Sequence, residues 1–199
     1  MENVLLLGLS SPVEDDPYGD PLLRALSAPG ASGTRLVVST APSVLARTGP
    51  DIDPAHPVAD ALRQMASLAD GLVIAAPESP GAPAESLRTL LNWLSWPTAA
   101  SPLVGKPVAV LTTTREPTAP SDPYCEVERM LFTAGAHMVG PRTVIPRAAH
   151  ALRETPDGQV SFSDPGAAVR LLFHIHRTAA AARERSGLPP ADDSRPWLL

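Results

Sequence analysis

The chain has 199 residues, a mass of 20.8 kDa and a formal net charge of -5, which suits one domain with a sizeable core. Apolar residues make up 44% and charged residues 19%, so the composition excludes a disordered chain and a basic nucleic-acid-binding surface. No segment approaches the roughly 18 consecutive apolar residues of a membrane span, and the N-terminus lacks the features of a signal peptide. A single cysteine excludes a disulfide framework, so we expect a soluble cytoplasmic protein.

Short apolar runs alternate with helical patterns along the chain, which is typical of a parallel sheet with crossover helices. The runs are continuously apolar, as expected for strands that are covered on both faces. The predicted strands are Asn3–Leu7, Arg35–Val38, Gly71–Ala75, Pro107–Leu111 and a weaker run at His137–Ile145, which Gly140 and Pro141 interrupt.

Helical patterns separate these runs, and the clearest of them places four leucines on one stripe at helical spacing. The predicted helices are Leu22–Leu26, Val58–Leu68, Ala84–Leu94, Glu126–Ala134 and Ala167–Arg185. Gly135 and Gly187 are predicted to end the last two helices. We expect one domain over residues 1–187 and an extended tail, rich in Pro and Asp, over residues 188–199. Trp197-Leu198-Leu199 at the end of the tail is either frayed or docked on a partner subunit.

Five strands in this alternation predict a doubly wound sheet. Ligands of such sheets bind beyond the carboxyl ends of the strands, near the point where the strand order reverses. The loops that follow Leu7, Ala75 and Leu111 are therefore the candidate ligand-binding loops.

Three stretches of sequence carry a family resemblance. The segment Ala69–Ser95 contains a strand, then Pro77, Glu78 and Gly81, then a helix with Leu87, Leu91 and Trp93. Leu103–Leu111 reads as a loop, Gly-Lys-Pro and a strand, and a late pattern runs from Gly135-Ala136 through Val144-Ile145-Pro146 to Ala148-Ala149. With these motifs the chain resembles the NAD(P)H-dependent FMN reductase family over most of Asn3–Arg185.

The resemblance implies a flavodoxin-like three-layer α/β sandwich, with a five-stranded parallel sheet and helices on both faces. It also implies an FMN-binding oxidoreductase that passes hydride from NAD(P)H to flavin and on to a small acceptor, such as free flavin, a quinone or a partner monooxygenase. A homo-oligomer, dimeric or tetrameric, is expected, with no nucleic-acid or membrane partner. No catalytic side chain is assigned, because the cofactor carries the chemistry.

The cofactor-binding residues that the resemblance implies lie in three loops. They are Ser10 and Ser11 in the first, Pro77, Glu78, Ser79 and Gly81 in the second, and Thr112, Thr113, Thr114 and Arg115 in the third.

These loops also depart from the family pattern. Where the family wraps the FMN phosphate, this chain has no Arg and carries four acids, Glu14, Asp15, Asp16 and Asp20. A like charge about 6 Å from the phosphate costs on the order of 3 kcal/mol at an effective dielectric near 20. Ser79 and Pro80 replace the Tyr and Asn of the second loop, and the third loop lacks the family's glycine pair.

The departures leave two alternative hypotheses open. One is a flavin-free flavodoxin-like protein that acts as a binding or assembly partner. The other is a biosynthetic enzyme that uses the same pocket for a different small molecule, with Arg115, the three threonines and Glu78 as polar contacts.

Two further features have a structural and a functional interpretation each. His174 and His176 could suggest a metal, but residues two apart on a helix point in opposite directions, so we predict no metal site and a partly buried helical histidine. Val169, Leu172, Phe173 and His176 share one stripe of that helix. Trp93 and Trp96 flank the end of the clearest helix and are equally compatible with core packing and with a dimer interface.

Overall fold

The central sheet of the computed structural model, which describes residues 3–10, 18–27, 33–39, 56–77, 85–114 and 126–187, is parallel. Its order is β2-β1-β3-β4-β5, with β6 also beside β4. The strands are β1 (Val4–Ser10), β2 (Thr34–Val38), β3 (Gly71–Pro77), β4 (Pro107–Thr113), β5 (His137–Met138) and β6 (Thr143–Ile145). This is the flavodoxin-like strand order, with its reversal between β1 and β3, so the predicted fold is confirmed.

The fifth strand is split, as the sequence predicted. β5 pairs with the start of β4, where Pro107 lies opposite His137, and β6 pairs with its end, where Thr113 lies opposite Ile145. Gly140, in the connection between them, has a φ of 71°, which a residue with a side chain rarely adopts. The interruption of the apolar run therefore corresponds to a gap in strand pairing: β5 pairs with β4 before the gap and β6 pairs with β4 after it.

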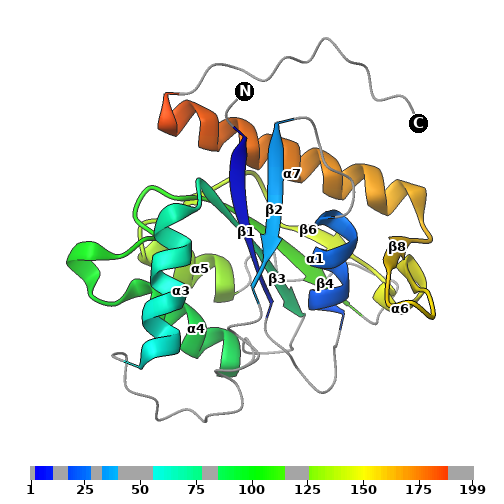
Figure 1. Ribbon diagram of the computed structural model, residues 1–199, viewed down its shortest axis with the longest axis horizontal. Coiled ribbons are helices and arrows are strands. Elements are labelled where there is room, and N and C mark those ends of the chain that lie inside the picture. Colours follow the sequence, from blue (N-terminus) through cyan, green and yellow to red (C-terminus); the bar gives the residue numbers. More distant parts are fainter. Residues whose placement is uncertain are drawn as a thin grey trace.

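Helices cover both faces of the sheet (Figure 1). On one face lie α3 (Pro57–Leu68), α4 (Glu85–Ser95) and α5 (Glu126–Thr133), and on the other α1 (Gly19–Ser27) and α7 (Pro165–Ser186). Alternate strand residues feed two apolar clusters, one with Leu72, Ile74 and Val110 and the other with Val73, Ala75 and Leu111. Both clusters are continuous because the central strands β1, β3 and β4 are apolar on both sides, as the sequence predicted. The same prediction was wrong for Arg35–Val38, since β2 lies at the edge of the sheet and leaves Arg35 and Val37 exposed.

The predicted ends of two helices are confirmed. Gly135 has a φ of 77° and its N–H donates to the Phe132 carbonyl, which closes α5. Gly187, with a φ of 66°, ends α7, and its N–H donates to the carbonyls of Arg183 and Glu184. At the start of α3, His56 Nδ1 accepts a hydrogen bond of 3.2 Å from the Val58 N–H, so this histidine caps the helix.

Several short elements were not predicted. A 3-10 helix, η1 (Thr98–Ala100), follows α4, and α6 (Ala148–Ala151) follows β6. Next comes an antiparallel hairpin of β7 (Leu152–Glu154) and β8 (Val160–Phe162), which packs beside α1. These strands are only three residues long, which is too short for an alternating apolar pattern to be distinguished from chance.

The orientation of α7 is a second finding that the sequence did not provide. The buried face of this helix carries Leu171, His174, Ile175, Thr178, Ala179 and Ala182. The stripe that the sequence singled out faces outward instead, with Val169 63% and Phe173 62% exposed. His174 is thus buried in the scaffold, and the ranges that the structure describes contain no cluster of three or more metal-ligating side chains. Among the helices in those same ranges, none is long and apolar enough to cross a membrane.

The two tryptophans have different environments. Trp93 is 4% exposed and belongs to the apolar cluster under α3, α4 and α5, which confirms core packing for this residue. Trp96 is 48% exposed, and the guanidinium carbon of Arg63 lies 5.3 Å from its ring centroid. Cys125 and the segment 188–199, with Trp197 to Leu199, lie outside the described residues.

Candidate functional site

Polar side chains gather where β1, β3 and β4 reach the carboxyl edge of the sheet. Each of these strands continues beyond the apolar run that predicted it, so Ser10, Pro77, Thr112 and Thr113 are strand residues and their assignment to loops was wrong. The ladder continues because hydrogen bonding between strands needs only backbone groups, whatever the side chain. Ser10 pairs with Ala75, which pairs with Leu111, so the polar ends of β1 and β4 flank β3.

The threonines at the end of β4 are buried, at 4%, 1% and 3% exposure for Thr112, Thr113 and Thr114. Thr112 lies two residues beyond Val110 and therefore shares the face covered by α3, α4 and α5. The backbone of Thr114 is tied to the neighbouring strand, since its N–H donates to Ile145 and its carbonyl accepts from Ala148, both at 3.1 Å. The end of β4 is therefore held rigidly by backbone contacts.

The hydroxyl of Thr112 distinguishes this position. Within the described part of the chain, Thr112 Oγ1 is a buried side-chain oxygen with no hydrogen-bond partner. A buried hydroxyl without a partner costs about 1–3 kcal/mol relative to one that is paired, so such groups are rare in folded proteins. At the ligand-binding edge of a doubly wound sheet, this hydroxyl is a donor and acceptor suited to a ligand.

Ser10 lies at the end of β1 beneath the start of α1. Its side chain is 4% exposed. A Cβ at Gly19, the first residue of α1, would lie 3.2 Å from Ser10 Cβ and 3.5 Å from Ala75 Cβ. A larger residue here would push the helix or the strand ends apart by a few tenths of an ångström, so glycine suits this close approach of the first turn of α1 to the carboxyl edge.

Asp20, one of the four acids expected near a phosphate, has an arginine as its ion-pair partner. Asp20 forms an ion pair of 3.0 Å with Arg24 one turn later on α1. Both side chains are 43% exposed, and Arg24 also lies 3.8 Å from Glu154 in the β7–β8 hairpin. The negative charge that Asp20 adds at this edge is therefore partly offset by Arg24, which Asp20 shares with Glu154.

The structure describes the side chains of only part of the predicted set, namely Ser10 and the three threonines. Thr112 lies on the face under α3, α4 and α5, whereas Ser10 lies on the opposite face beside α1. Outside the described residues lie Ser11, Glu14, Asp15, Asp16, Glu78, Ser79, Pro80, Gly81 and Arg115. For Pro77 only the backbone is described, at the end of β3 opposite Thr113.

Two buried titratable side chains support the scaffold and not this edge. Desolvation lowers the pKa of His174, whose Nε2 donates to the Val139 carbonyl and whose Nδ1 accepts from Thr143 Oγ1, both at 2.6 Å. Desolvation also lowers the pKa of Lys106, whose Nζ donates to the carbonyls of Ser67 and Ala69 at the end of α3. The neutral histidine ties α7 to the split fifth strand, and the lysine ties α3 to β4.

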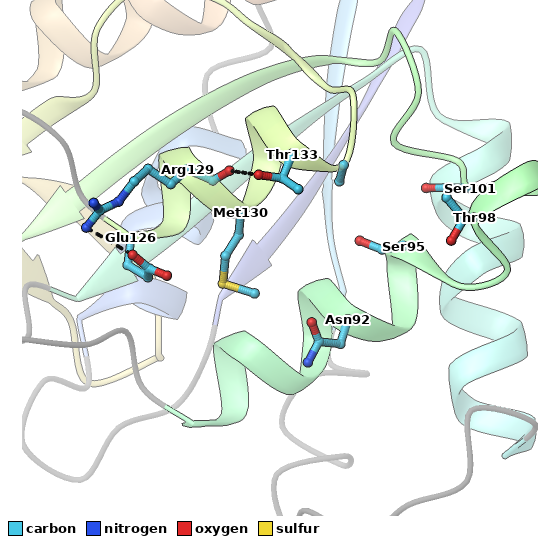
Figure 2. A pocket seen from close by; sticks show the side chains of 9 residues that line it. Asn92, Ser95, Thr98, Ser101, Glu126, Arg129, Met130 and Thr133 are labelled. Atoms are coloured by element: carbon cyan, nitrogen blue, oxygen red, sulfur yellow. Dashed lines mark hydrogen bonds and ion pairs between the residues drawn. The ribbon is translucent and has the colours of Figure 1, made fainter.

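Sequence reasoning missed a cavity of about 390 Å³ between α4, η1 and α5 (Figure 2). Its hydroxyls are engaged with backbone carbonyls: Ser95 with Leu91 at 2.7 Å and Thr133 with Arg129 at 2.9 Å. Its charges are paired with each other, since Arg129 lies 3.0 Å from Glu126. Most of the polar side chains that line the cavity are thus engaged within the protein, and we assign it no ligand.

The strand order defines a flavodoxin-like α/β protein, and buried hydroxyls lie at the carboxyl edge of its sheet. Residues 22–150 match the family model of NADPH-dependent FMN reductase, which is more than half of the chain, and the chain belongs to this family. It is therefore an NAD(P)H-dependent oxidoreductase of the flavin-using class. No curated protein sequence matches the chain closely enough to count as a relative.

Solved structures share the fold at low sequence identity. FerB, a flavoenzyme NAD(P)H:(acceptor) oxidoreductase from Paracoccus denitrificans, superposes with a TM-score of 0.67 at 18% identity, covering 92% of this chain and 98% of that one. The apo form of the NADH:FMN oxidoreductase EMOB gives 0.59 at 16% identity, covering 97% and 94%. RosB with its bound intermediate 8-demethyl-8-formylriboflavin-5'-phosphate gives 0.59 at 16% identity, covering 96% and 84%. At these identities the likeness concerns the fold alone.

Proposed function

We propose that this protein binds FMN at the carboxyl edge of β1, β3 and β4 and uses NAD(P)H to reduce a small acceptor. The observation that carries the proposal is the buried, unpartnered hydroxyl of Thr112 at the edge where ligands of this fold bind. The family match and the RosB structure, which holds a flavin phosphate derivative, support the choice of flavin.

The described residues fit such a group. The hydroxyls of Ser10, Thr112, Thr113 and Thr114 lie at the ends of β1 and β4, on either side of β3, and are uncharged, so none of them repels a phosphate or an electron-rich ring. Asp20 is paired with Arg24, which offsets part of its charge. We infer that Thr112 would hydrogen-bond to the polar edge of the ring system, and that Ser10 would lie on the side of the phosphate tail.

When bound, flavin accepts a hydride equivalent from the nicotinamide and delivers electrons to an acceptor. The chain's own contribution is orientation and the exclusion of water. Val110 and Ala76, at 1% and 3% exposure, give the edge an apolar floor next to Thr112. The hydrogen bonds of Thr114 to Ile145 and Ala148 hold that floor in place. No proton transfer by a side chain is required by this chemistry.

The acceptor and the assembly belong to the same proposal. Free flavin, a quinone and a partner monooxygenase are the acceptor classes we propose, and the printed description of FerB as an NAD(P)H:(acceptor) oxidoreductase supports a small acceptor. We further propose a homo-oligomer in the cytoplasm, with one domain over residues 1–187 and a separate tail over residues 188–199.

The proposal is tested by following NADPH and NADH oxidation by the purified protein with FMN and, in parallel, with a quinone or excess free flavin. Protein-dependent oxidation that requires FMN supports the proposal, and the preferred acceptor and nucleotide are read from the rates. If the protein leaves the oxidation rate at the protein-free level with every acceptor, the reductase proposal is wrong. The second hypothesis, a different small molecule in the same pocket, would then be the one to pursue.

A further inference from the structure

A long apolar stripe on the outer face of α7 has no covering element among the described residues. α7 is the longest helix that the structure describes and runs across one face of the sheet (Figure 1). Val169 is 63% exposed and Phe173, one turn later, is 62% exposed. Leu172, next to them, is only partly buried. We call Val169, Leu172 and Phe173 the α7 stripe. Neighbouring exposed aromatic and aliphatic side chains on one helix face are unusual in a protein without a partner for them.

One flank of the α7 stripe is basic. Arg170 and Arg177 are both exposed and lie seven residues apart, so they project from the same side of the helix. Within the described residues neither guanidinium has an ion-pair partner. An occupant of the stripe should therefore combine apolar side chains with acidic ones.

A second copy of α7 would supply apolar side chains to the stripe but no acidic side chains to its basic flank. Packing α7 against α7 of another molecule would bring two more arginines against the two already present. The first three turns of the helix carry no acid that would offset them. Like charges at an interface centre disfavour association, so the charges argue against this occupant.

The segment that follows α7 has the required composition. Residues 188–199 read LPPADDSRPWLL, with two adjacent acids, Asp192 and Asp193, one arginine, Arg195, and then Trp197, Leu198 and Leu199, so acidic side chains outnumber basic ones. Pro189 and Pro190 cannot continue the helix. The left-handed conformation of Gly187 changes the direction of the chain at this point.

The spacing of these residues matches the spacing on α7. From Gly187 back to Arg177 the helix measures about 15 Å, and back to Phe173 and Val169 about 21 and 27 Å. An extended chain at about 3.1 Å per residue places Asp192 and Asp193 about 16–19 Å beyond Gly187 and Trp197 about 31 Å beyond it. The acids therefore reach Arg177 and the tryptophan reaches the stripe, both in one antiparallel register.

We propose that residues 188–199 fold back along α7 of their own chain and dock Trp197 on the α7 stripe, with Asp192 and Asp193 facing Arg177. The inference is independent of the flavin proposal, because α7 contributes no residue to the carboxyl-edge site described above. Docking covers Val169 and Phe173 and leaves the outer face of α7 polar.

Cysteine cross-linking tests the proposal in the full chain. In a Cys125→Ser background, Val169→Cys combined with Trp197→Cys should form an intramolecular disulfide under mild oxidation, seen as a monomer on a non-reducing gel and as a linked peptide by mass spectrometry, because Val169 is the stripe residue closest to Trp197 in this register. Phe132→Cys with Trp197→Cys is the matched control, because Phe132 is 78% exposed on α5, across the sheet. Its cross-linking rate should be at least several-fold lower.

Charge reversal tests the acidic contact within the same cysteine pair. Arg177→Glu in the 169–197 pair should slow disulfide formation several-fold, and adding Asp192→Lys with Asp193→Lys should restore the rate. A rate no higher than that of the 132–197 control overturns the proposal. A disulfide-linked dimer as the main product also overturns it, because the occupant would then be another copy of the chain. An unchanged rate in Arg177→Glu would overturn the proposed contact of Asp192 and Asp193 with Arg177.

Discussion

Replacing Thr112 by Val tests the proposed ligand contact and the flavin-free fold in one variant. Valine has nearly the shape of threonine and removes only the hydroxyl. Thr112 is 4% exposed and its Oγ1 has no hydrogen-bond partner among the described residues. The substitution therefore takes away a buried polar atom that the protein alone does not satisfy, and valine also suits the interior of β4.

The two expected effects have opposite signs. Without flavin, the free energy of unfolding should rise by about 1 kcal/mol, because an unpaired buried hydroxyl costs about 1–3 kcal/mol. For a chain of this size that corresponds to an increase in Tm of about 2–4 °C. With flavin, the loss of one neutral hydrogen bond, about 0.5–1.5 kcal/mol, should weaken FMN binding about 2- to 12-fold.

Thermal unfolding with and without FMN, together with an FMN titration, measures both effects. Thr178→Val is the matched control, since Thr178 is fully buried on α7 and its Oγ1 donates to the His174 carbonyl at 2.8 Å. This control should lose up to about 1 kcal/mol of stability and keep the wild-type affinity for FMN. A less stable Thr112→Val protein, or one with unchanged FMN affinity, would refute the reasoning.

Three further predictions concern the scaffold. Burial lowers the pKa of His174 below its ordinary 6.5, so the unfolded chain binds the proton first as pH falls. Thermal scans should therefore show Tm falling as pH drops below about 6.5, and a His174→Gln variant should lose part of that slope; equal slopes would contradict this. Trp93→Ala should cost about 3–5 kcal/mol in denaturant unfolding, whereas Trp96→Ala, at a 48% exposed position, should cost less than about 1 kcal/mol. Similar losses for both would argue against a core position for Trp93. Lys106→Met removes the donor to the Ala69 carbonyl and should destabilise the protein by about 1–3 kcal/mol; wild-type stability would contradict the contact.

The strands and the layers were predictable because burial on both faces leaves a continuous apolar run. Gly71–Ala75 and Pro107–Leu111 lie within β3 and β4, and even the interruption at Gly140 has a counterpart in the split fifth strand. The carboxyl ends of the strands were not predictable from this signal. Ser10 and Thr112 are polar, so the run stops before them, although backbone pairing continues through both.

The orientation of α7 could not be derived from periodicity for a different reason. Two stripes of this helix have apolar residues at helical spacing, and the one with Phe173 has the larger side chains. The other stripe packs against the sheet because small residues on it, such as Ala179 and Ala182, let the helix lie close to the strands. His174 is tolerated in the interior since both ring nitrogens have hydrogen-bond partners, which no sequence pattern reveals.

The candidate site was predictable in location and only partly in composition. The switch point of a doubly wound sheet pointed to the carboxyl edge, and the hydroxyl-bearing residues that the family resemblance supplied do lie there; that this edge binds the ligand stays a prediction. The ion pair of Asp20 with Arg24 depends on the first turn of α1, so counting acids along the sequence overstated the negative charge near Ser10.

Equilibrium titration of the full chain with FMN is the most direct test of the central claim that the carboxyl edge of this sheet is a flavin site. The account predicts saturable binding at one FMN per chain, with a yellow visible absorption band that NADPH bleaches. A protein that stays colourless at saturating FMN and leaves the fluorescence of the added flavin unchanged would contradict it.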